Sequence, residues 1–258
     1  MGTAEKFIVR SKKNSTGASK IVALAENEKH VLDSRKHLLP TTHEGREALG
    51  HRELRVPATW EEFLKFSAIS EYNVQYREGQ IISFIEIDEQ TNCIMGQASL
   101  PHEMLVGRFI TRLSNLLDDI HNDYLVLGSN AKIFIAPDRG GFNADVTVVK
   151  GTPKLLKYKV NKRSYDGVTN PWLVVEVLST STRRFDLTEK LGDYQKIESL
   201  QQMIFVEQDS INIKTYIRQG NNPWLFIELK DIKDELPIFE KDETISLSDI
   251  YQTLNLKR

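Results

Sequence analysis

One carboxylate interrupts an otherwise apolar stretch in the middle of this chain. Glu176 lies within Trp172–Leu178, a run in which all the remaining residues are apolar. Such a run predicts a strand buried on both faces, where a carboxylate without a partner costs several kcal/mol. A second acid, Asp145, opens the largely apolar stretch Asp145–Val149 earlier in the chain. Two such acids on neighbouring strands indicate a site for a divalent metal ion.

The composition limits the classes of protein to which the chain can belong. Its 258 residues, 40% of them hydrophobic, are enough to bury one sizeable core. A formal net charge of -2 does not fit a nucleic-acid coat protein or a polybasic membrane binder, so any nucleic-acid contact must come from a local patch. The lone Cys93 excludes an internal disulfide, and no run approaches the roughly 20 apolar residues that cross a bilayer. We therefore expect a cytoplasmic protein without a membrane partner.

Two regions of different character divide the chain. Residues 1–56 are polar with scattered basic residues, which predicts a flexible or partner-dependent extension. The folded domain is expected to cover residues 57–258. At its start, Thr59 and Glu62 form a capping-box pattern for a short helix.

The remaining elements follow from the spacing of apolar residues and from the breaker residues between them. Helical spacing predicts a long helix from Pro101 to about Ile120 and a second helix over 181–197. Strands are expected at 80–85, 125–127, 131–135, 144–149, 172–178, 203–206, 211–217 and 224–229, and a short closing helix within 245–254. Helices against a mixed sheet place the fold in the α/β class, with α+β as its variant.

A lysine on the second predicted helix is the third candidate for the site. Lys190 comes three residues after the apolar Leu187, which directs its side chain toward the core. Two carboxylates and an ammonium are what metal-dependent phosphodiester hydrolysis requires, because the acids hold Mg2+ and the lysine orients water or offsets developing charge.

Each of these three residues also has a simpler interpretation. Asp145 can cap a strand or pair with a surface lysine, and Glu176 can belong to a buried ion pair. Lys190 can bridge to Asp186 on the surface of the helix, which is worth only about 0.2 to 0.5 kcal/mol.

The combination of several segments is more specific than any one residue. They are Glu78–Ile81, His102–Phe109, Ala144–Val149, Leu173–Arg183 and Asp186–Tyr194. Together they resemble the Uma2-like group of endonucleases, within the PD-(D/E)XK restriction-endonuclease-like superfamily. The resemblance covers roughly residues 59–254, and it implies a central mixed sheet flanked by helices. Ala144 departs from the group, which has a proline there, and the extension has no counterpart that we can place.

The resemblance assigns roles to the candidate residues. It implies that Asp145 and Glu176 bind Mg2+ or Mn2+, with the backbone carbonyl of Val177 as a further ligand. It also implies that the catalytic lysine has moved from the strand to the following helix, since Leu178 occupies the usual lysine position and Lys190 lies on the helix. The resemblance implies an endonuclease that cleaves DNA with Mg2+. This enzyme is expected to be a homodimer. The alternatives are a non-catalytic DNA-binding module on the same fold and a small-molecule phosphohydrolase.

Further residues are candidates for accessory roles. Glu78 resembles an acid of the group that contacts the metal through water, although an acid in the tight turn before Gly79 needs no such role. His102 matches a histidine at the start of the first long helix, where a structural histidine is the alternative. Tyr194 is expected in the core with its hydroxyl near the site.

A basic segment between the two acids is a candidate for contact with nucleic acid. Its cations are interleaved with apolar residues, as expected of a surface that grips a phosphate backbone, and a solvated loop is the alternative. The residues are Lys154, Lys157, Lys159, Lys162 and Arg163. The hydroxyl run Ser179–Thr182 can likewise contact phosphate, or it can cap the second helix.

Overall fold

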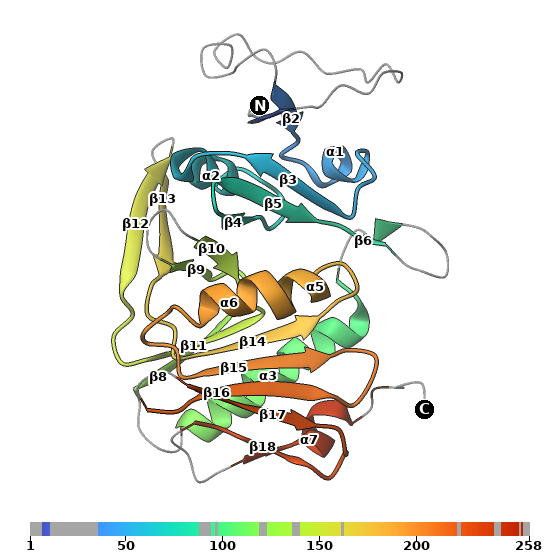
Figure 1. The fold of residues 1–258 in the computed structure, drawn as a ribbon, viewed down its shortest axis with the longest axis vertical. Coiled ribbons are helices and arrows are strands. Elements are labelled where there is room, and N and C mark those ends of the chain that lie inside the picture. Colours follow the sequence, from blue (N-terminus) through green and yellow to red (C-terminus); the bar gives the residue numbers. More distant parts are fainter. Residues whose placement is uncertain are drawn as a thin grey trace.

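The structure is a computed structural model with two large sheets and helices packed against them (Figure 1). It describes residues 7–10, 36–87, 94–95, 98–118, 123–135, 140–160, 163–220, 223–239, 244–252 and 254. Cys93 and Lys162 lie outside the described residues. Among the described residues, no helix has both the length and the apolar character that a membrane span requires.

A six-stranded mixed sheet forms the centre of the domain. Its order is β17-β16-β15-β14-β11-β8, and β14 and β15 are parallel while all other neighbours are antiparallel. The strands are β8 (Tyr124–Gly128), β11 (Val146–Lys150), β14 (Leu173–Leu178), β15 (Gln202–Glu207), β16 (Ile213–Arg218) and β17 (Trp224–Leu229). This mixed sheet with flanking helices confirms the predicted fold class.

Helices cover both faces of this sheet. The long helix α3 (Leu100–Asp118) and the closing helix α7 (Leu247–Tyr251) pack on one face, which Figure 1 shows behind the strands. The second predicted helix lies on the other face and has three parts: α5 (Arg183–Phe185), the π-helical turn η2 (Asp186–Lys190) and α6 (Leu191–Tyr194). The central strand β14 is therefore buried on both faces, as its sequence predicts.

A second sheet of seven strands packs over the face that carries α5 and α6. Its order is β12-β13-β9-β10-β4-β5-β3. The strands are β3 (Glu53–Pro57), β4 (Gln75–Arg77), β5 (Gln80–Phe84), β9 (Lys132–Ile135), β10 (Gly140–Asn143), β12 (Leu155–Val160) and β13 (Arg163–Val168). Ile82, Ile133 and Phe142 of this sheet share one apolar core with Val174 of β14, so the two sheets meet beside Glu176. Helix α2 (Trp60–Ser67) covers the seven-stranded sheet and begins with the predicted capping box of Thr59 and Glu62.

The ordered part of the domain begins before the boundary predicted at residue 56. Strand β3 spans that boundary and forms one edge of the seven-stranded sheet. Before it lie β1 (Phe7–Arg10), its antiparallel partner β2 (Lys36–Leu39), and helix α1 (His43–Glu47). Leu39 and Arg46 are buried, which fixes this polar segment on the domain. The rest of the predicted extension, residues 1–6 and 11–35, lies outside the described residues.

The basic segment, a candidate contact with nucleic acid for which a solvated loop was the alternative, is a β-hairpin. Strands β12 and β13 pair from Leu155 opposite Val168 to Val160 opposite Arg163. Leu156 and Tyr158 pack on the core, whereas Lys157 and Lys159 point to solvent, because successive side chains of a strand alternate between its two faces. Two smaller ribbons complete the fold: β6 (Glu86–Ile87) with β7 (Ile94–Met95), and β18 (Glu235–Pro237) with β19 (Thr244–Ser246).

Candidate functional site

Asp145 lies where β11 begins, next to the central strand β14. Pairing of β11 with β14 starts at Val146 opposite Val175, so Asp145 is just outside the ladder. Its Oδ2 accepts a hydrogen bond of 2.7 Å from the backbone N–H of Val177. The N–H and C=O groups of one strand residue point toward the same neighbour, so the Val177 carbonyl faces the side of the strand on which Asp145 lies. The candidate ligands Asp145 and Val177 are therefore adjacent.

Glu176 points from β14 toward the π-helical turn and is only 3% exposed. Its Oε1 lies 2.8 Å from Lys190 Nζ and accepts a hydrogen bond of 2.7 Å from the hydroxyl of Tyr194. Lys190 also donates to the backbone carbonyl of Asn143 at 2.8 Å. The fold thus brings Lys190 to Glu176 and places the Tyr194 hydroxyl beside them.

The π-helical turn adds a carboxylate that the sequence interpretation did not include in the site. Asp186 Oδ1 lies 3.4 Å from Lys190 Nζ, and both side chains are buried. The pair is therefore not the helix-surface bridge that was the simpler interpretation of Lys190. One-turn π segments inside α-helices often occur at functional sites, because they change which side chains share a face. The spacing of Asp186 and Lys190 was visible in the sequence, but the π turn had no sequence signal.

The cluster contains more acid than base. Burial raises the pKa of Glu176 to about 8, Lys190 opposes this rise, and the nearby Asp186 and Asp145 add to it. Burial likewise raises the pKa of Asp186. Burial would lower the pKa of Lys190, but the carboxylates of Glu176 and Asp186 raise it overall, so its ammonium stays charged. Three carboxyl groups thus surround one ammonium, and an added cation would favour their ionised forms.

His102 in the first turn of α3 joins this cluster through Asp145. Its Nε2 lies 3.4 Å from Asp145 Oδ2. Burial would lower the pKa of His102, but the hydrogen bond and charge of Asp145 raise it overall. Its Nδ1 is buried and, among the described residues, has no hydrogen-bond partner. His102 therefore contacts Asp145, a candidate metal ligand, as an accessory residue of the site would.

Glu78 lies outside the cleft that contains the acid cluster. It occupies the turn between β4 and β5 with a φ of 49°, followed by Gly79 with a φ of 76°. These two positive values fit a tight turn of two residues between antiparallel strands. The Glu78 side chain is 69% exposed, pairs with Arg77 at 2.8 Å, and is not among the residues that line the cleft beside the acid cluster. Its place fits the turn role, which is the alternative to an accessory contact with the metal.

The basic hairpin is also separate from the cluster. Lys154, Lys157 and Lys159 are exposed and line no part of the cleft that contains Asp145 and Glu176. Arg163 begins β13, and Lys162 lies outside the described residues. Contact of this hairpin with nucleic acid stays a prediction.

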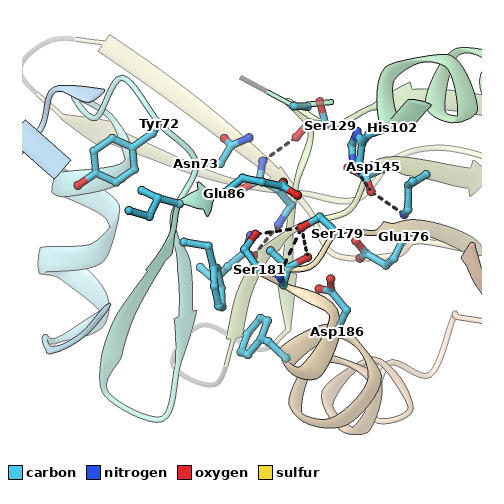
Figure 2. A pocket seen from close by; sticks show the side chains of 18 of the residues that line it. Tyr72, Asn73, Glu86, His102, Ser129, Asp145, Glu176, Ser179, Ser181 and Asp186 are labelled. Atoms are coloured by element: carbon cyan, nitrogen blue, oxygen red, sulfur yellow. Dashed lines mark hydrogen bonds and ion pairs between the residues drawn. The ribbon is translucent and has the colours of Figure 1, made fainter. Parts of the chain in front are cut away.

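A cleft with a cavity volume of about 260 Å3 opens between the two sheets and contains the cluster. Figure 2 shows Asp145, Glu176 and Asp186 on one side of it, and Tyr72 and Asn73 on the other. The hydroxyls of Ser179, Ser181 and Thr182 also line it, and Ser179 Oγ lies 2.9 Å from Ser181 Oγ and accepts from Thr182 N–H at 3.4 Å. Glu86, which sequence reasoning missed, lies in the same cleft, and burial raises its pKa.

Two arginines of the seven-stranded sheet hold the helix that carries Lys190. Arg55 makes a bidentate pair with Glu189 at 2.8 and 2.7 Å. Arg77 bonds Asp193 at 2.6 Å and Glu189 at 3.2 Å. We refer to Arg55, Arg77, Glu189 and Asp193 as the arginine clamp. It joins the seven-stranded sheet to this helix directly beside Lys190, and none of its members was predicted as a site residue.

The donor atoms of the cluster suit a hard cation. Among the described residues, no three side chains of His, Cys, Asp or Glu are grouped to hold a metal ion. The predicted set, however, has only two carboxylates, Asp145 and Glu176, with the Val177 carbonyl as a backbone oxygen. Mg2+ keeps several waters and is often held by one or two carboxylates, so this set fits it. The protein hydrogen bonds to these acids use Oδ2 of Asp145 and Oε1 of Glu176, and each carboxylate has a second oxygen.

Comparison with known proteins identifies related sequences. A model of the Uma2 family, described as "Putative restriction endonuclease", matches residues 60–257. The uncharacterized protein sll1609 of Synechocystis sp. is 35% identical over 125 residues, which are 48% of this chain and 68% of that protein. The uncharacterized protein slr1290 of the same organism is 27% identical over 194 residues, which are 75% of this chain and 91% of that protein. The family match includes Asp145, Glu176 and Lys190 and begins after α1 and β3.

Proposed function

The chain belongs to the Uma2 family, and from that premise we propose that it is a Mg2+-dependent endonuclease that hydrolyses phosphodiester bonds in DNA. The observation that carries the proposal is the buried contact between Lys190 Nζ and Glu176 Oε1 at 2.8 Å, in a cleft that also contains Asp145. A lysine from a helix completes the set of two acids and an ammonium that this chemistry requires.

Asp145, Glu176 and the Val177 carbonyl are the proposed ligands of Mg2+ or Mn2+. Hard oxygen donors and an excess of buried acid groups over bases both support a divalent cation at this position. When bound, the ion supplies Lewis-acid stabilisation of the phosphate and lowers the pKa of water. The Val177 N–H fixes Asp145 and the Tyr194 hydroxyl fixes Glu176, so both carboxylates are oriented before a ligand arrives.

Lys190 is the proposed catalytic ammonium. Its charged form is favoured by Glu176 and Asp186, so it is ready to orient a water molecule or to offset negative charge on the phosphate oxygens. The bond from its Nζ to the carbonyl of Asn143 holds the side chain in the wall of the cleft. His102, in contact with Asp145, is the proposed accessory residue that keeps this carboxylate in place.

A calorimetric titration with Mn2+ tests the ligand assignment. We expect saturable binding that Asp145→Ala abolishes, followed by cleavage of DNA in the presence of the metal by the unsubstituted protein only. Binding with no cleavage of any nucleic acid, but with turnover of small phosphoesters, would select a phosphohydrolase. Absence of metal binding, even with substrate DNA present, would select a non-catalytic DNA-binding module. The homodimer expected from the resemblance stays a prediction, to be checked by sedimentation.

A further inference from the structure

The cleft has a second wall, and part of this wall is built by a segment that precedes the region matched by the family model. That match begins at residue 60, whereas His43, Arg46 and Glu47 of α1 line the cleft. Opposite the acid cluster, the cleft therefore includes residues from outside the matched region as well as Tyr72 and Asn73 from within it.

Arg46 places a buried cation in this second wall. The residue is 1% exposed, and its Nε donates to Ser83 Oγ at 2.8 Å. Its Nη2 donates to the backbone carbonyls of His51 at 2.8 Å and Ser83 at 3.1 Å. Its Nη1 is buried and has no hydrogen-bond partner among the described residues.

The charge of Arg46 is not paired with an acid of the described residues. Its hydrogen-bond partners among these residues are all neutral: one hydroxyl and three backbone carbonyls. An arginine keeps its charge even when burial lowers its pKa, as it does here. A charge in a low-dielectric wall acts over a longer range than one in water, so Arg46 favours an anion at this end of the cleft, against the acids Glu47 and Glu86 that also line it.

The groups around Arg46 suit a nucleotide. The ring centroids of His43 and Tyr72 lie 5.9 Å apart. The exposed Asn73 lies between Tyr72 and the acid cluster in the cleft (Figure 2). Aromatic side chains and amides of this kind stack on and hydrogen-bond to unpaired bases. A cavity of about 260 Å3 is below the usual range of small-molecule pockets, roughly 300 to 1,000 Å3, and holds about one nucleotide, not a duplex.

We propose that α1 adds a phosphate subsite to the cleft, in which Arg46 attracts a phosphate that neighbours the scissile one on an unpaired nucleic-acid strand. This inference rests on the proposed nuclease function and specifies its substrate: a single strand, or a strand locally opened at the site of cleavage. The acid cluster and Arg46 then serve two different phosphates of one strand, the first through a metal ion and the second through a fixed cation.

Binding of a fluorescent single-stranded DNA oligonucleotide to the full chain, in EDTA and over a range of salt concentrations, tests the subsite. We expect tighter binding of the single strand than of a duplex of the same sequence. Arg46→Gln should weaken binding by roughly tenfold and reduce the slope of log Kd against log salt by about 0.7, the value for one phosphate on a single strand. A merely structural role of Arg46 would leave that slope unchanged.

A second variant keeps the test decisive if Arg46→Gln does not fold. Asn73→Asp adds a negative charge at the same end of the cleft without removing a side-chain hydrogen bond to the described residues, and should weaken binding by about three- to tenfold. Gln219→Glu makes the same amide-to-acid change at an exposed position outside the cleft and should have no effect. Equal binding of RNA and DNA single strands would support the subsite, because it recognises phosphate.

Three results would overturn the inference: tighter binding of the duplex, an unchanged salt slope in folded Arg46→Gln, or equal losses in Asn73→Asp and Gln219→Glu. These measurements are made in EDTA, so they do not depend on cleavage. If the binding measurements agree with the subsite but the protein never cleaves nucleic acid, the subsite stands and only the nuclease proposal fails.

Discussion

The Nζ atom of Lys190 lies 2.8 Å from Oε1 of Glu176, although the two residues belong to a π-helical turn and to the central strand of the sheet. The lysine is 2% exposed and the glutamate 3%, so water screens neither charge. Contact between a strand carboxylate and a lysine from the following helix agrees with the arrangement that the resemblance to the Uma2-like group implies. Because the two residues have different proposed roles, substitution of Lys190 and substitution of Glu176 should have different effects.

Lys190→Ala should retain the metal and lose turnover. The lysine is not a proposed ligand, and its removal leaves Asp145 and the Val177 N–H in place. We expect the rate of DNA cleavage to fall by about two to four orders of magnitude, as when a positioned catalytic group is removed. Single-turnover cleavage measured beside Mn2+ calorimetry separates the two effects. Loss of metal binding in a folded Lys190→Ala protein would contradict the assigned role.

Glu176→Gln should abolish metal binding at little cost in stability. The amide keeps the shape of the side chain and its contact with Tyr194, and it removes one of three carboxylates that repel each other. Lys190 retains Asp186 as a partner. Calorimetry with Mn2+ and a urea unfolding curve check both expectations.

Glu207→Gln provides the matched control for that substitution. Glu207 is a buried acid of the neighbouring parallel strand, outside the cleft, so its variant should still bind the metal. If Glu176→Gln unfolds and the unsubstituted protein binds no metal, the cluster is a buried ion pair and nothing more.

The pH dependence of metal binding follows from the raised pKa of Glu176. Burial shifts it from 4.5 to about 8, with Lys190 opposing the shift and Asp186 and Asp145 adding to it. A divalent cation binds the ionised carboxylate, so below about pH 8 binding releases a proton. We expect the affinity for Mn2+ to rise by up to about tenfold per pH unit between roughly pH 6 and pH 8 and then to level off. Calorimetry in two buffers of different ionisation enthalpy measures the released proton directly.

The stability of the metal-free protein should depend on pH with the opposite sign. The carboxyl of Glu176 loses its proton near 4.5 in the unfolded chain and near 8 in the folded protein. The folded state thus binds more protons between these values, so stability is greatest below about pH 4.5 for this group and is lost as the pH rises to about 8. Urea midpoints of the metal-free protein and of Glu176→Gln should converge at low pH. Parallel curves across this window would contradict a protonated Glu176.

Sequence periodicity was sufficient for the strand that carries Glu176 and for the inward direction of Lys190, but not for the π turn. The apolar run around Glu176 predicts a buried strand, and the spacing of Leu187 and Lys190 directs the lysine inward, because these patterns depend on local geometry alone. The hairpin of β12 and β13 was missed although Leu156 and Tyr158 alternate with lysines, since charge concealed a period-two pattern. The sequence around Arg46 gives no local signal that this residue is buried in the cleft wall, because its hydrogen-bond partners come from a distant strand and from the loop after α1.

Glu78→Gln should leave metal binding unchanged. The side chain is exposed and pairs only with Arg77 among the described residues, so it contributes to the turn and not to the cleft. Gly79→Ala, by contrast, forces a side chain into a φ of 76° and should lower the free energy of unfolding by about 1 kcal/mol. Mn2+ titration and urea unfolding of both variants check this division. A weaker affinity for Mn2+ in Glu78→Gln would restore its accessory role.

Loosening the arginine clamp should lower turnover while the metal site survives. Arg55 holds Glu189 with two hydrogen bonds, and a lysine cannot reproduce this bidentate geometry. Arg55→Lys should therefore destabilise the fold by about 1 kcal/mol, since the pair is partly exposed and screened. It should also allow the helix to shift Lys190 relative to Glu176, and displacement of a catalytic group lowers the rate steeply.

The sharpest measurement of the clamp is a double-mutant cycle of Arg55→Lys and Glu189→Gln, with cleavage rate and Mn2+ affinity measured on each protein. We expect coupled losses of rate with an unchanged affinity for Mn2+. Lys65→Ala, which breaks an exposed pair with Glu61 on α2, is the control and should change neither quantity. Additive effects of the two clamp substitutions would mean that Arg55 and Glu189 do not position Lys190 together.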